Sequence, residues 1–106
     1  MPKYLVRGSY TVDGIKGLLK EGGSARKSHI EQLIRGMGGT VEAFYFAFGG
    51  DDVVVIIDLP DGASATALSL AVAAGGAFRP TTTVLITPEE MDQAAGITVS
   101  YRPPGQ

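Results

Sequence analysis

The chain has 106 residues, of which 44% are hydrophobic and 19% charged, and its nine Lys and Arg against eleven Asp and Glu give a formal net charge of −2. This length suits one domain with a single modest core. The charge balance excludes the clustered positive charge that binds nucleic acid and the polybasic surface that binds anionic membranes. The chain has no cysteine, which excludes disulfides, zinc–thiolate sites and thiol chemistry. With neither a signal-peptide pattern nor an apolar run near the ~20 residues of a membrane span, the sequence predicts a cytoplasmic protein.

The first predicted element is a strand over Lys3–Tyr10, in which Gly8 indicates a bulge or a close approach by another group. A helical segment opens at Thr11–Gly14 and breaks at Gly22–Gly23. Ser24 is expected to cap a second helix, which should end at Gly38–Gly39. That helix carries an amphipathic stripe at i, i+3, i+4 and i+7, formed by Ile30, Leu33, Ile34 and Met37.

A second strand is predicted over Thr40–Phe48, and the short turn Gly49–Asp52 should join it to the next strand as a hairpin. Strict alternation along this strand predicts two faces. One consists of Phe44, Phe46 and Phe48, and the other of Val41, Ala43, Tyr45 and Ala47.

The second half of the chain predicts a helix, a strand and a further short helix. The helix, over about residues 63–74, is capped by Asp61 or Ser64 and is rich in alanine, which lets it lie close to a sheet. The strand follows over residues 77–86. Thr87 caps the last helix, which begins at Pro88 and ends near Gly96. The sequence therefore predicts one domain over residues 1–98 and an extended C-terminal tail over 99–106, which is either an arm on a neighbouring subunit or a frayed end.

The stretch Asp51–Pro60 is the most informative part of the chain, because its five consecutive apolar residues, Val53–Ile57, cover both faces of one strand. The order β-α-β-β-α-β places both long helices on one face of an antiparallel sheet, which is an α+β, ferredoxin-like fold with an added C-terminal helix. The open face then carries one of two sets: Val54 and Ile56 with Phe44, Phe46 and Phe48, or Val53, Val55 and Ile57 with Tyr45. Either set would leave a large apolar surface exposed to solvent, so the sequence predicts that a second copy of the chain covers it. The predicted assembly is at least a homodimer, a dimeric α+β barrel, with Val54, Ile56 and Phe46 in the interface.

The residues Gly49–Val54, with Phe44–Phe48 before them and Leu59–Asp61 after them, resemble the GYD domain family. The segments Thr82–Leu85 and Thr87–Glu90 match the end of that family, and the resemblance covers about residues 3–95. These are small, mostly bacterial proteins grouped with the dimeric α+β barrels, and the family has no generally established reaction. The resemblance therefore implies fold and oligomerisation more than activity. The position of the name-giving tyrosine holds Asp51 here.

Four side chains are candidates for a ligand site between helices and sheet: Tyr10, Arg26, His29 and Tyr45. His29, the single histidine, suits a general base or a haem ligand, or else an ordinary helix histidine, which is favoured because no second ligand stands at matched spacing. Asp51 and Asp52 suit turn chemistry better than a cation site. Asp58 is expected to pair with Arg7.

The predicted function is that of an uncharacterised homo-oligomeric protein, a small-molecule-binding or assembly module with no cofactor and no metal site. The alternative is a cofactor-independent enzyme of the monooxygenase or isomerase kind. A roomy cavity where the polar candidates converge favours the enzyme, and a filled core favours binding or assembly.

Overall fold

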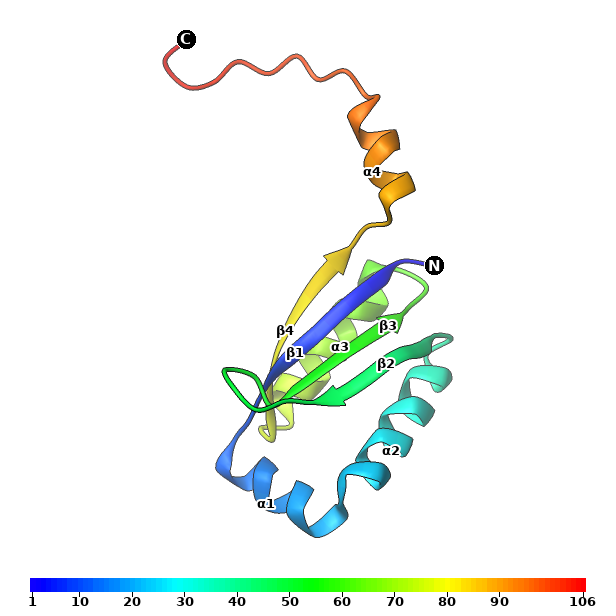
Figure 1. The fold of residues 1–106 in the computed structure, drawn as a ribbon, viewed down its shortest axis with the longest axis vertical. Coiled ribbons are helices and arrows are strands. Elements are labelled where there is room, and N and C mark those ends of the chain that lie inside the picture. The colour runs from blue at the N-terminus through cyan, green and yellow to red at the C-terminus, as the bar shows by residue number, and fades with distance from the viewer.

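The computed structural model describes residues 1–106 and has the α+β, ferredoxin-like arrangement that the sequence predicts (Figure 1). Its elements are β1 (Lys3–Tyr10), α1 (Val12–Glu21), α2 (Gly23–Gly36), β2 (Thr40–Phe46), β3 (Val53–Asp58), α3 (Gly62–Ala74), β4 (Phe78–Leu85) and α4 (Pro88–Ala95). The four strands form one antiparallel sheet in the order β2-β3-β1-β4. Helices α2 and α3 lie on the same face of this sheet.

Gly8 lies on β1 beside the neighbouring strand β4. A side chain at this position would overlap the carbonyl oxygen of Arg79, so only glycine lets the two backbones approach. The close approach predicted for Gly8 is therefore confirmed.

Asp61 and Thr87 cap helices α3 and α4 as the sequence predicts, and Thr11 caps α1. The side chains of Thr11, Asp61 and Thr87 each accept a hydrogen bond from a backbone N–H in the first turn, and Thr87 forms a full capping box with Glu90. The Ser24 cap is wrong, because α2 begins one residue earlier. Gly22 has a φ of 93°, donates its N–H to Leu18 at the end of α1, and accepts the N–H of Arg26 in α2. One glycine thus serves as the junction of both helices.

Strand β2 departs from strict alternation. It ends at Phe46 rather than Phe48, and its pairing with β3 shifts between Val41 and Ala43. This bulge puts Val41 on the same face as Phe44, whereas the alternating pattern places them on opposite faces. The predicted hairpin between β2 and β3 is confirmed.

Strand β3 alternates along its whole length between buried and half-buried residues. Val53, Val55 and Ile57 face the helices, and Val54 and Ile56 face away from them. The open face combines Val54 and Ile56 with Tyr45, so it matches neither of the two predicted sets. Phe46 pairs with Val53 and lies against Gly23 of α2, which places it on the helix-covered face. The core consists of Tyr4, Ile34, Val53, Val55, Ile57, Leu59 and Ala65.

Helix α4 and residues 96–106 extend away from the sheet and its helices (Figure 1). The molecule is 56 Å along its longest axis, and none of the α4 residues is buried. Of the four helices, none has both the length and the apolar character needed to cross a bilayer.

Replacing Leu59 by Ala should lower the free energy of unfolding by about 2–5 kcal/mol, because Leu59, in the segment that connects β3 to α3, is fully buried. Leu70→Ala is the matched control, since Leu70 is 66% exposed and should change stability by less than about 0.5 kcal/mol. Urea unfolding at fixed protein concentration measures both. If Leu59→Ala and Leu70→Ala lowered the free energy of unfolding equally, the placement of Leu59 in the core would be contradicted.

Candidate functional site: a groove between two helices

A groove separates α2 from α3, and its origin is the width of the sheet. Helix α2 packs on the edge strand β2, and α3 packs on the opposite edge strand β4. Four strands spaced about 4.8 Å apart put the two edges roughly 14 Å from each other, whereas helices in contact lie about 8–10 Å apart. The helices therefore leave the middle of the sheet uncovered, and the side chains of β1 and β3 form the floor of a groove.

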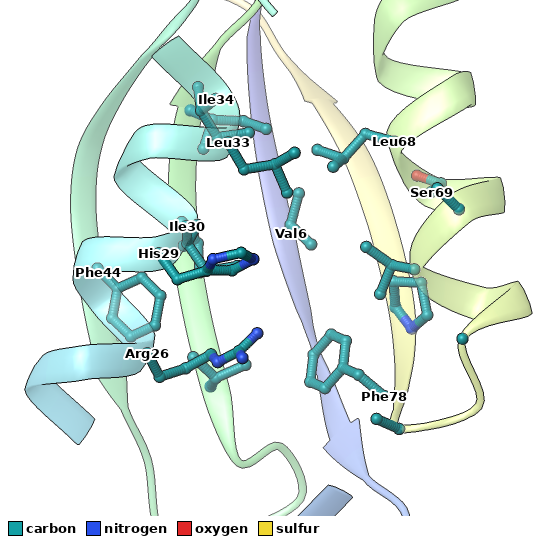
Figure 2. A pocket seen from close by; sticks show the side chains of 18 of the residues that line it. Val6, Arg26, His29, Ile30, Leu33, Ile34, Phe44, Leu68, Ser69 and Phe78 are labelled. Carbon is teal, nitrogen blue, oxygen red and sulfur yellow. The ribbon is translucent and has the colours of Figure 1, made fainter. Parts of the chain in front are cut away.

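The groove has a volume of about 550 Å³ and is lined by 21 residues, 16 of them hydrophobic. Val6 and Val55 form its floor, and Leu33 and Leu68 enter it from the two helices. Figure 2 shows Arg26 and His29 projecting from α2 into the groove, with Phe78 on the opposite side. Pockets that hold small molecules are typically of this volume and mainly apolar.

Polar groups concentrate at one end of the groove. The Arg26 guanidinium donates two hydrogen bonds to the Glu21 carboxylate, at 2.8 and 3.1 Å. Donation from Arg26 holds the pKa of Glu21 below its usual value, and the same bond raises the pKa of Arg26. Burial raises the pKa of the Tyr10 hydroxyl, so Tyr10 is a proton donor at neutral pH.

A second cavity of about 510 Å³ adjoins this end, and Tyr10 and Arg26 line both. Glu21, Asp13 and Lys20 give this second cavity a polar lining, in contrast to the apolar groove. Tyr10 and Arg26 therefore stand at the boundary between a polar cavity and an apolar one. A ligand with an apolar body and one polar group fits such a boundary.

Three of the four predicted ligand-site residues, Tyr10, Arg26 and His29, line the groove. Tyr45 does not: it pairs with Val54 on the open face of the sheet and is 70% exposed. Phe44 pairs with Val55 and lines the groove, so the face of β2 that carries Phe44 is the one the helices cover.

The pairing of Asp58 with Arg7 is wrong, because the register of β1 against β3 sets Lys3, not Arg7, opposite Asp58. Lys3 lies 2.9 Å from Asp58 and 3.0 Å from Glu42, and the hydrogen bond to Asp58 raises the pKa of Lys3. Arg7 pairs instead with Asp51, at 3.3 Å. The neighbouring Asp52 accepts the backbone N–H of Tyr10.

The α3 wall of the groove has no counterpart among the predicted site residues. It is formed by a stripe at i, i+3, i+4 and i+7, which comprises Leu68, Ala71, Val72 and Gly75. That spacing is visible in the sequence, but the surrounding alanines hide it because they are apolar on every side of the helix. Ser69 also lines the groove, where its hydroxyl is paired with that of Thr82 at 2.7 Å.

Tyr10 should ionise later than an ordinary tyrosine, whose pKa is 10.0. A folded pKa above the unfolded one means that the folded chain keeps a proton the unfolded chain has lost, so this contribution to stability disappears as pH rises above about 10. Ultraviolet titration of the tyrosines should show a late component that Tyr10→Phe removes. Loss of that component in Tyr101→Phe instead would contradict the assignment, since Tyr101 is 72% exposed.

Comparison with known proteins gives one match. The family model described as the GYD domain matches residues 4–95, which is most of the chain. No curated protein and no solved structure matches it. The matched range contains the whole sheet except Lys3, together with the groove and the hairpin between β2 and β3. The chain therefore belongs to the GYD domain family.

Proposed function

We propose that this protein binds a small apolar molecule with one polar group in the groove between α2 and α3, and that it does so as a homo-oligomer. The observation that carries the proposal is the groove itself: about 550 Å³ in volume and mostly hydrophobic, with Tyr10, Arg26 and His29 at its polar positions. An apolar body would lie on the groove floor, against the half-buried Val6 and the buried Val55. Its polar group would meet Tyr10 and Arg26 at the boundary of the second cavity.

The polar group that best suits this end is one that accepts hydrogen bonds. Tyr10 remains protonated at neutral pH and Arg26 carries only donors. Glu21 already neutralises Arg26 through their paired hydrogen bonds. A carbonyl, a phenol or a similar neutral acceptor therefore fits better than a second carboxylate, which would have to compete with Glu21.

Self-association would use the open face of the sheet. Its centre is apolar and includes Leu5, Val54 and Ile56, which are only half-buried in the single chain. The ion pairs of Lys3 with Asp58 and of Arg7 with Asp51 lie at its two ends. An apolar centre with a charged rim is the usual composition of a protein interface, and a stable one buries roughly 800 Å² on each partner.

A second candidate function is cofactor-independent catalysis in the same groove. It is favoured by the presence of a proton donor, Tyr10, and an imidazole, that of His29, in the lining of one apolar cavity. Metabolites of the host can be incubated with the protein and with His29→Gln and then compared by mass spectrometry. A compound consumed by the first protein and not by the second would favour this candidate.

Filling the groove should abolish binding of an apolar fluorescent probe such as anilinonaphthalene sulfonate. Ala71→Phe adds a ring on the groove side of α3, and we expect probe affinity to fall at least about tenfold, or 1.4 kcal/mol. Ala73→Phe is the matched control, because it adds the same ring to the same helix outside the groove. Fluorescence titration measures both. Equal probe binding by both variants would count against the groove as the site.

Charging the open face should dissociate the oligomer. Val54→Lys with Ile56→Lys would leave two charges buried in a sheet-to-sheet interface, at a cost of several kcal/mol. Sedimentation equilibrium should then show a folded monomer. Leu70→Lys is the control on an exposed helix position and should remain oligomeric. A double variant that stays folded and oligomeric would refute association through this face.

A further inference from the structure

The segment Ile97–Tyr101 has the sequence of a β-strand but no strand partner. Ile97, Val99 and Tyr101 alternate with Thr98 and Ser100, which is the pattern of a strand with one apolar face. The three apolar residues are 66%, 75% and 72% exposed. The amides of Thr98, Val99 and Ser100 donate to no acceptor in the chain.

Helix α4 holds this segment away from its own sheet. Pro88 restricts Thr87 to an extended conformation, with φ −76° and ψ 160°, and the capping box with Glu90 fixes the start of the helix. The arm, defined as residues 86–106, therefore continues outward from the end of β4 (Figure 1). The radius of gyration of 16.9 Å exceeds the roughly 13 Å of a compact domain of this length.

The sheet has two free edges, and they differ in their capacity to accept another strand. The edge on β4 contains Pro80, which has no N–H to offer. The edge on β2 contains no proline and pairs only with β3 on its other side. Beyond the bulge, its stretch Ala43–Phe46 carries Tyr45, 70% exposed, and Phe46, 42% exposed. This edge offers both unpaired backbone groups and uncovered aromatic surface.

We infer that Ile97–Tyr101 of one copy of the chain adds to the sheet of a second copy, as an extra strand beside Ala43–Phe46 of β2. Every copy carries both the arm and the free edge, so a two-fold axis allows the exchange to be mutual and closed. Main-chain hydrogen bonds would satisfy the orphan amides of the arm. The alternating apolar side chains would cover aromatic surface of β2.

This exchange rests on the proposed self-association but uses a different surface from Val54 and Ile56. It makes each sheet incomplete without its partner. It also protects an edge that would otherwise accept any extended chain, because a covered edge cannot template aggregation.

Disulfide cross-linking tests the exchange directly, because the chain contains no cysteine of its own. Val99→Cys and Ser100→Cys place a thiol on either face of the arm, and each is mixed with Tyr45→Cys in full-length chains of different mass that are unfolded and refolded together. Thr83→Cys, on the same open face of the other edge strand, is the matched control for Tyr45→Cys. We expect one of the two arm cysteines to cross-link to position 45 of the other chain, and neither to cross-link to position 83.

A cross-link from the arm to position 83 of the other chain would overturn the inference. A chain that carries both an arm cysteine and Tyr45→Cys can also be oxidised, and a cross-link that forms only within that one chain would overturn the inference too. A dimer in which no cross-link forms would also overturn the exchange of arms. That result would not contradict association through the open face. As a second readout, Val99→Pro with Ser100→Pro removes two strand amides, and Gly105→Pro serves as the control. The double variant should raise the dimer dissociation constant at least about tenfold while probe binding in the groove persists. An unchanged constant would also overturn the exchange.

Discussion

The structure depends on strand β3, whose side chains are apolar on both of its faces. Val53, Val55 and Ile57 anchor α2 and α3, and the core residues Ile34 and Leu59 gather on that side. Val54 and Ile56 give the other side an apolar centre that one copy of the chain does not cover. A strand of this kind is typical of the interior of a layered protein, yet the chain supplies helices for only one layer. The proposed association through the open face follows from that imbalance.

The groove follows from a second geometrical constraint, the mismatch between sheet width and helix spacing. Two helices placed over the two edge strands of a four-stranded sheet cannot touch each other without leaving those strands. The gap between them falls over β1 and β3, the two central strands. The fold thus produces an apolar cavity without any residue dedicated to making it. Tyr10 and Arg26 supply polar groups at the end of the groove that adjoins the second cavity, and His29 supplies one on the α2 side.

Much of the fold could be predicted because local signals act at short range. The caps at Thr11, Asp61 and Thr87 each depend on a side chain and an amide within four residues, so their spacing is visible in the sequence. The β2 register was not visible in this way. A single bulge moved Val41 to the face of Phe44 and left Tyr45 on the open face with Val54. Alternation by itself cannot reveal a bulge, since one extra residue inverts every assignment on one side of it.

The sequence by itself determined the element order, the topology, the family and the apolar character of both faces of β3, because composition and periodicity act along the chain. It also identified Tyr10, Arg26 and His29 as polar candidates near the helices. Tertiary structure decided which of them share a cavity, that Lys3 rather than Arg7 pairs with Asp58, and that α3 supplies one wall of the groove. It also showed that the arm points away from its own sheet. These features depend on strand register and on the distance between elements far apart in sequence, which no local pattern encodes.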